Sequence, residues 1–241
     1  MSIIRYAVLN DIHFPYEHKR KYAKALSIIG KWDNLSGIYL NGDILEIESL
    51  SRHPKGPQAI KSFEYEIDYA NSKFDEICET FKDVPVTLVE GNHCYRLFRY
   101  IRDIAPEMWG LIDNPQLLKF PDRGWKFVPY GPSQYVQCGK TRLYVRHEPL
   151  AGGVNCAKAT AEKSWVDTLF GHTHVEQRYT VRLQGPTQKL IRAYSGGWLG
   201  DKTRPCFDYR GPRDNWVEGF SEITCDDKDK SGDYEYRFIY L

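Results

Sequence analysis

The chain has 241 residues, of which 41% are hydrophobic and 27% charged, and a formal net charge of +1. These values exclude a disordered or fibrous chain, and the small net charge excludes a strong overall attraction to nucleic acid. Six cysteines without a Cys-x-x-Cys pair exclude a thiolate zinc site and favour a reducing compartment. With no apolar run of about 18 residues and no signal-peptide pattern, we expect one soluble, cytoplasmic domain over residues 1–241, without a membrane partner.

Short β-rich runs that end in polar residues predict eleven strands along the chain. They cover Ile3–Leu9, Gly37–Leu40, Val84–Val89, Lys126–Pro129, Gln134–Val136, Arg142–Val145, Thr168–Phe170, Gln177–Leu183, Lys189–Tyr194, Gly219–Thr224 and Glu235–Tyr240. Helical patterns over His18–Lys31 and Gln58–Phe81 separate the first three strands, and a further helix is predicted over Arg96–Ile104. The β-α-β-α-β order predicts parallel strands in the first half.

The second half is richer in strands, and turn residues join several of them. Cys138-Gly139-Lys140 and Gln184-Gly185-Pro186 each lie between two strand runs, which predicts antiparallel hairpins. A sheet begun by βαβ units and completed by hairpins indicates an α/β fold. We expect a four-layer α-β-β-α sandwich, in which two mixed sheets are flanked by helices.

Five predicted strands run into side chains of the kinds that bind metal ions. These side chains are Asp11 and His13, Asp43, Asn92 and His93, His147, and His172 and His174. In open α/β sheets the carboxyl ends of the strands line the ligand crevice, so groups far apart in sequence are expected to converge there. A lone histidine or a loop aspartate is more often a core residue or a helix cap, but that explanation has to account for all of these positions at once.

The spacing within two of these segments supports convergence. In an extended segment residues i and i+2 project to the same side, as Asp11 with His13 and His172 with His174 would. Carboxylate, amide and imidazole groups without thiolate suit Mn, Fe, Zn or Ni. Seven of these groups, namely Asp11, His13, Asp43, Asn92, His147, His172 and His174, exceed what one ion needs, and two divalent metal ions about 3.5 to 4 Å apart would use them all.

Glycine precedes a predicted ligand in three of the segments, at Gly42, Gly91 and Gly171. A residue without Cβ lets the backbone turn sharply out of a strand and leaves the mouth of a cavity open. These glycines are therefore predicted to shape the loops that present the ligands.

At these residues the chain resembles the calcineurin-like metallophosphoesterase superfamily, whose pattern is D-x-H, G-D, G-N-H, a lone His and G-H-x-H. The five blocks occur in this order between Asp11 and His174. The resemblance implies a metallophosphoesterase-like fold and a two-metal-dependent phosphoesterase that uses metal-activated hydroxide. It also implies a role for each residue: Asp11, His13 and His174 on the first metal, Asp43 bridging, Asn92, His147 and His172 on the second metal, and His93 as the general acid.

The chain departs from the family where many relatives have Asp or Glu directly after G-N-H, because it has Cys94 there. A carboxylate that orients His93 then has to come from elsewhere, with Glu46 and Glu48 as candidates. Arg96, Arg99 and Arg102 follow at intervals of three residues and either meet substrate phosphates or form a solvated face, with Arg96 the favoured substrate-binding residue.

A second basic cluster combines Lys202, Arg204, Arg210 and Arg213 with Phe207, Tyr209 and Trp216. This mixture suits backbone contact and base stacking on a nucleic acid, and equally a solvated loop. We expect a phosphodiester substrate, nucleic acid or nucleotide, with a phosphomonoesterase, a catalytically silent binding scaffold and a DNA-binding module as alternatives. The sequence does not determine the oligomeric state.

Overall fold

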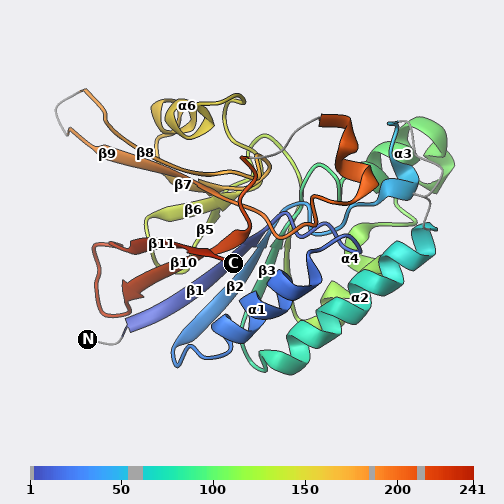
Figure 1. Ribbon diagram of the computed structural model, residues 1–241, viewed down its shortest axis with the longest axis horizontal. Coiled ribbons are helices and arrows are strands. Elements are labelled where there is room, and N and C mark those ends of the chain that lie inside the picture. The colour runs from blue at the N-terminus through green and yellow to red at the C-terminus, as the bar shows by residue number, and fades with distance from the viewer. Residues whose placement is uncertain (1–2, 54–61, 185–187, 211–214) are drawn as a thin grey trace.

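The computed structural model describes residues 3–53, 62–184, 188–210 and 215–241, apart from the side chains of residues 208–210. Its strands form two mixed sheets between layers of helices (Figure 1). Helices α1 (Lys19–Ile29) and α2 (Phe63–Thr80) cover one sheet, and α6 (Cys156–Lys163) covers the other. The predicted α/β sandwich of two mixed sheets flanked by helices is therefore confirmed.

The first sheet has six strands in the order β11-β10-β1-β2-β3-β4. Their bounds are β11 (Glu235–Tyr240), β10 (Gly219–Asp226), β1 (Ile3–Asn10), β2 (Leu35–Asn41), β3 (Val86–Val89) and β4 (Lys126–Val128). Strands β1, β2 and β3 are parallel to one another, as the β-α-β-α-β order predicts, and β4 also pairs parallel with β3. Strand β10 pairs antiparallel with both β1 and β11.

The second sheet has five strands in the order β5-β6-β7-β9-β8. Their bounds are β5 (Val136–Gln137), β6 (Leu143–Arg146), β7 (Asp167–Phe170), β9 (Leu190–Gly196) and β8 (Glu176–Arg182). The pairs β5·β6 and β8·β9 are antiparallel, which confirms both predicted hairpins, although residues 185–187 of the second turn lie outside the described residues. The pairs β6·β7 and β7·β9 are parallel.

All eleven predicted strands are present, with ends that differ from the prediction by no more than two residues. The helix predicted over Arg96–Ile104 is α3, with the same bounds, and residues 58–61 of the helix predicted over Gln58–Phe81 lie outside the described residues. The sequence did not predict α6, α4 (Asn114–Leu117), α5 (Phe120–Arg123) or the 3-10 helices η1 (Glu48–Leu50), η2 (Pro106–Met108) and η3 (Pro205–Arg210). Most of these are single turns, which leave no periodic pattern.

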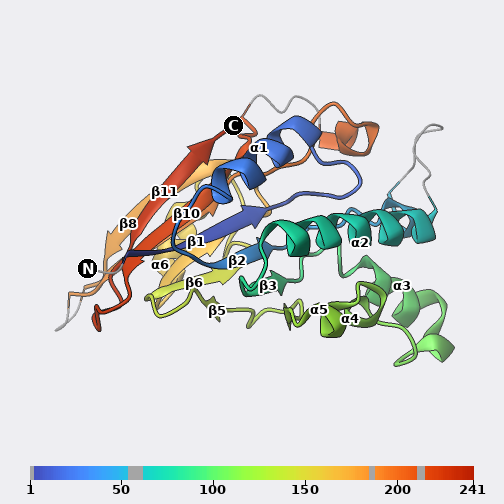
Figure 2. The same ribbon diagram turned by 90° about the horizontal axis from the view of Figure 1, so that it is seen from below.

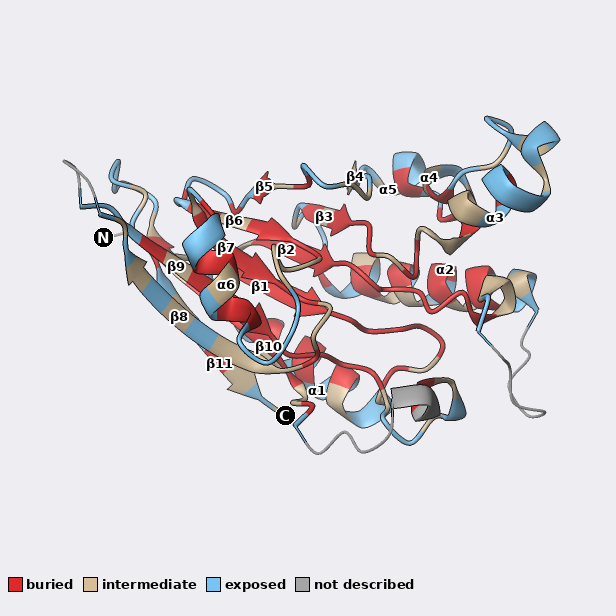
Figure 3. Ribbon diagram, turned by 90° about the horizontal axis from the view of Figure 1, so that it is seen from above, coloured by how far each residue is buried: buried red, intermediate tan, exposed pale blue. Residues whose placement is uncertain are grey.

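The alternation of side chains along β1 shows how the layers pack. Ala7 and Leu9 belong to the core between the first sheet and helices α1 and α2, whereas Tyr6 and Val8 belong to the core between the two sheets. The last five residues of the central strands β1 and β2 are buried, while β8 and α3 carry half-buried and exposed residues (Figure 3). Among the residues that the structure describes, no helix has both the length and the apolar composition needed to cross a membrane.

Strands β1, β2 and β3 run in the same direction and end at one edge of the first sheet (Figure 2). Strands β6 and β7 of the second sheet are also parallel to each other. Because the carboxyl ends of parallel strands meet at one edge, the loops that follow these strands lie together.

Candidate metal centre

The loops after five parallel strands carry the side chains singled out in the sequence. Asp11 and His13 follow β1, Asp43 follows β2, Asn92 and His93 follow β3, His147 follows β6, and His172 and His174 follow β7. Asn92 and His172 are half-buried, and the others are buried. The structure brings all eight side chains into one region, where all of them except His93 form two linked groups.

The backbone of these loops differs from the extended form expected for the two i, i+2 pairs. Asp11 and His13 have φ values of 48° and 57°, and His172 and His174 have φ values of 67° and 61°. Asp43 also lies in the left-handed region, at 44°. Such a conformation costs about 1–3 kcal/mol for a residue with a side chain. The paired side chains do converge, but tight left-handed turns rather than extended backbone bring them together.

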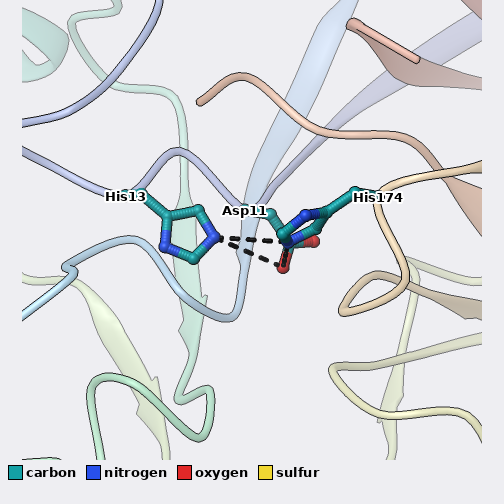
Figure 4. Close-up of side chains that lie close together, drawn as sticks. All are labelled: Asp11, His13 and His174. Carbon is teal, nitrogen blue, oxygen red and sulfur yellow. Dashed lines mark hydrogen bonds and ion pairs between the residues drawn. The ribbon is translucent and has the colours of Figure 1, made fainter. Parts of the chain in front are cut away.

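The first group consists of Asp11, His13 and His174, which Figure 4 shows with their polar atoms facing one another. Nε2 of His174 lies 3.3 Å from Oδ1 of Asp11 and 3.4 Å from Nε2 of His13. Nε2 of His13 lies 3.9 Å from the same Asp11 oxygen. Three possible ligand atoms thus surround one position.

The second group consists of Asp43, His147 and His172, with Asn92 between the two imidazoles. Oδ1 of Asn92 lies 3.0 Å from Nε2 of His147 and 2.9 Å from Nδ1 of His172. Nε2 of His147 lies 3.2 Å from Oδ2 of Asp43. The backbone amide of His172 donates to Oδ2 of Asp11 at 2.9 Å, which ties this group to the first.

A buried carboxylate, Glu46, connects the first group to His93. Its Oε2 lies 2.6 Å from Nδ1 of His13 and 2.8 Å from Nδ1 of His93, and its Oε1 accepts from Nη1 of Arg96 at 2.7 Å. Of the two carboxylates proposed from the sequence to orient His93, Glu46 makes this contact. Glu48 instead accepts a hydrogen bond from the hydroxyl of Tyr16.

The charges in the centre follow from burial and from the facing groups. Burial on its own would raise the pKa of Asp43, but the imidazoles of His147 and His93 hold it well below its ordinary value. Burial opposes charge on His147 too, yet Asp43 raises the pKa of His147 to about 9. Burial lowers the pKa of His174 to about 4, which leaves this imidazole neutral near neutral pH. At neutral pH the centre therefore combines the carboxylate of Asp43, a protonated His147 and a neutral nitrogen lone pair on His174.

Two further observations fit a divalent cation at these residues. The contact between Glu46 and Nδ1 of His13 places the proton of neutral His13 on Nδ1, so the lone pair on Nε2 faces Asp11 and His174. Oδ1 of Asp11 is buried and accepts no hydrogen bond of regular geometry from the described residues. An oxygen that has lost its water without gaining a donor suits a metal ion, so these buried clusters are able to hold one.

The glycines act partly as predicted. Gly42 has a φ of +71°, which favours glycine, and an added Cβ would lie 1.9 Å from Nδ1 of His147. Gly91 has no such φ, but its Cβ would lie 2.1 Å from the backbone nitrogen of Asp43. For Gly171 the clash would be with Oδ2 of Asp11, at 2.4 Å. Close packing of the loops against the ligands, more than a sharp turn, therefore requires glycine at the last two positions.

Aromatic side chains pack against His174. The sequence pattern did not assign them to the site. The ring of Trp198 stacks on His174 with a centroid separation of 4.7 Å, and Trp216 packs edge-on at 4.3 Å. Trp198, Phe207 and Trp216 form one buried cluster. No motif marks these residues, because they come from segments that meet only in the folded chain.

This cluster corrects the base-stacking interpretation of the second basic segment. Phe207 and Trp216 are only 1% and 8% exposed, so their rings are not available to bases. Arg204 pairs with Asp201. Arg213 and the side chains of Tyr209 and Arg210 lie outside the described residues.

A cavity of about 580 Å³ adjoins the second group, and Asn92, His93 and Arg96 line it. Nη2 of Arg96 lies 3.3 Å from Nε2 of His93. Arg99 also lines the cavity, whereas Arg102 is half-exposed and pairs with the neighbouring Asp103. The three arginines of α3 therefore do not act as one row.

Comparisons with known proteins identify remote relatives. No family model matches the chain. The chain is 22% identical over 236 residues to the Gene 54 proteins of Mycobacterium phages D29 and L5, covering 92% of this chain and 89% of each relative.

Among solved structures, vacuolar protein sorting 29 of Cryptosporidium parvum aligns with 14% identity and a TM-score of 0.45 over 100% of this chain and 99% of that one. Vps29 of Chaetomium thermophilum aligns with 12% identity and a TM-score of 0.44, over 99% and 93%.

Proposed function

We propose that this protein is a two-metal-dependent phosphoesterase of the calcineurin-like superfamily and that it hydrolyses a phosphodiester. The observation that carries the proposal is the pair of linked, buried groups, Asp11-His13-His174 and Asp43-His147-His172. They contain residues that match the family pattern, which supports the roles that the pattern implies. A scaffold that had lost its chemistry would not be expected to keep every one of these groups.

In the proposed assignment Asp11, His13 and His174 would hold one cation, Asn92, His147 and His172 would hold the other, and Asp43 would serve both. The cations would supply a nucleophilic water near neutral pH and would neutralise the phosphoryl oxygens; Mn is the first candidate, with Fe, Zn and Ni as alternatives.

His93 is proposed to protonate the leaving oxygen. Its Nε2 lies 3.9 Å from Oδ2 of Asp43, so it faces the region where the phosphate would bind without belonging to either ligand group. Arg96 lines the neighbouring cavity and also supports Glu46, so it is proposed to contact substrate from a fixed position. The cavity leaves space beside His93 for a large group on the leaving oxygen, such as the second nucleoside of a diester.

The test uses purified protein with Mn²⁺ and three substrates side by side: bis-p-nitrophenyl phosphate, p-nitrophenyl phosphate and single-stranded DNA. Diester hydrolysis with about two metal equivalents per chain supports the proposal, and Asp43→Asn should abolish it. Asp33→Asn, at an exposed position, is the matched control. Hydrolysis of the monoester alone would overturn the diester assignment, and a protein that stays metal-free and inert with Mn²⁺ would be a scaffold.

A further inference from the structure

The cavity beside His93 lies between the segment around η1 and helix α3. Its lining consists of Ser49, Leu50, Ser51, Arg52, His53, Asn92, His93, Arg96, Arg99, Tyr100 and Ile104. Of the metal-site residues only Asn92 lines it, together with His93, while the first group does not. The cavity therefore opens on the side of the proposed general acid, which is the side of the leaving group.

The cationic lining of this cavity is unevenly neutralised. Arg96 pairs with Glu46, and Arg52 pairs with Asp103. Arg99 has no carboxylate partner among the described residues: its Nη2 donates to the backbone oxygen of Asn92 at 2.5 Å, and its guanidinium lies 5.9 Å from the ring centre of Tyr95. The Nε atom of Arg99 is buried and has no hydrogen-bond partner among the residues that the structure describes. Such a fixed cation attracts an anion.

Part of the cavity lining is apolar. Tyr100 and Ile104 belong to the same helix as Arg99 and are 40% and 64% exposed, and Leu50 faces them from η1. A volume of about 580 Å³ falls within the range of sites that hold small organic ligands and exceeds what one phosphate needs. An aromatic ring together with an arginine that has no carboxylate partner among the described residues is a combination that suits a base and its phosphate.

We propose that this cavity is the subsite for a nucleotide leaving group, in which Arg99 binds the next phosphate and Tyr100 contacts the base. The inference rests on the proposed function and narrows its substrate to an oligonucleotide-type diester. Water adds to phosphorus and gives up a proton to solvent, and the P–O bond to the nucleotide breaks. The leaving oxygen takes the proton of His93, which solvent replaces. Nothing in this step requires a further reactant.

The test compares a thymidine dinucleotide with and without a second phosphate on the leaving nucleoside. The extra phosphate should raise kcat/KM of the wild type about tenfold or more, as expected for a charge-assisted contact. Arg99→Ala should remove this gain. Tyr100→Ala should lower kcat/KM for both dinucleotides more than for bis-p-nitrophenyl phosphate. Arg102→Ala, on the same helix but outside the cavity, should keep the gain. Metal content is measured on every variant, because Arg99 also contacts Asn92.

Calorimetry with thymidine 5′-monophosphate gives a readout that does not depend on turnover. If thymidine 5′-monophosphate binds more weakly to Arg99→Ala than to the wild type and to Arg102→Ala, the result supports the subsite. This holds even if the protein hydrolyses no ester; in that case only the proposed function fails. If Arg99→Ala hydrolyses the diester and the second phosphate still raises its kcat/KM as much as in the wild type, the subsite is overturned and the proposed function stands. An equal loss on every substrate, with lost metal, likewise overturns it, because Arg99 would then only support Asn92.

Discussion

Oε2 of Glu46 lies 2.8 Å from Nδ1 of His93, although 47 residues separate them in sequence. The residue after His93, Cys94, cannot orient the imidazole, because its thiol is buried in the helix-side core and burial raises its pKa to about 12. Since Glu46 also contacts His13, one carboxylate supports both the proposed acid and a proposed metal ligand.

Glu46→Gln is expected to weaken both functions of this carboxylate. The carboxamide loses the negative charge that holds Arg96 and the two imidazoles, so we expect about a 10- to 100-fold loss of metal affinity or activity. Metal titration and kcat on a diester measure the two effects separately. Glu79→Gln, an exposed change on α2, serves as the control. Unchanged values for both quantities would show that Glu46 is only a packing residue.

His93→Ala should lower turnover while the metal stays bound. General acids contribute about 10²- to 10⁴-fold, and most when the leaving group is a poor one. An alkyl diester should therefore lose far more activity than bis-p-nitrophenyl phosphate. Equal rates for wild type and variant on the alkyl diester would remove the acid role from His93.

Gly91→Ala is expected to destabilise the fold and to disturb the metal site. The new Cβ would lie 2.1 Å from the backbone nitrogen of Asp43 and 2.2 Å from its Oδ1, so the loop has to move. We expect a loss of about 2 kcal/mol or more in the free energy of unfolding, measured by urea denaturation. Gly131→Ala is matched, since its Cβ would have no neighbour within 4 Å, and should change stability by about 0.5 kcal/mol or less. Similar values for the two variants would contradict this account.

Divalent metal should stabilise the protein, because it relieves the buried charges of Asp11 and Asp43. At a free Mn²⁺ concentration of about 100 Kd, the gain in unfolding free energy should be about 2.7 kcal/mol. Thermal denaturation with and without a chelator measures it. Asp43→Asn should lose most of this gain while Asp33→Asn keeps it; a Tm that does not respond to Mn²⁺ in the wild type would argue against the metal centre.

Stability should fall as the pH rises through the titration of Glu66. This carboxyl accepts hydrogen bonds from the backbone amides of Glu48 and Ser49, but burial raises its pKa above the ordinary 4.5. Between 4.5 and that raised value the folded protein binds more protons than the unfolded chain, so the contribution of Glu66 decreases with pH.

Glu66→Gln should therefore flatten the dependence of unfolding free energy on pH in this window. Urea denaturation at several pH values from about 4 to 8 measures it. Glu64→Gln, exposed on the same helix, should keep the slope of the wild type. A slope that is identical in all three proteins would show that Glu66 does not titrate there.

The sequence by itself determined the strands and the candidate ligands. Alternating apolar residues mark strands such as β1, where Ala7 and Leu9 face one core and Tyr6 and Val8 the other. Because parallel strands present their carboxyl ends at one edge, the residues that follow them were expected to meet. Local chemistry and sheet geometry are sufficient to predict the strands and the convergence of the candidate ligands.

Only the tertiary structure decided the contacts between segments that are distant along the chain. It selected Glu46 over Glu48 as the partner of His93, and it buried Phe207 against His13 and Trp216 against His174. It also left Arg99 facing a cavity, while Arg102 pairs with Asp103. The left-handed turns at the ligands also depend on surrounding packing, which stabilises conformations that local preferences disfavour. Such choices depend on which surfaces pack together, and a linear pattern does not contain that information.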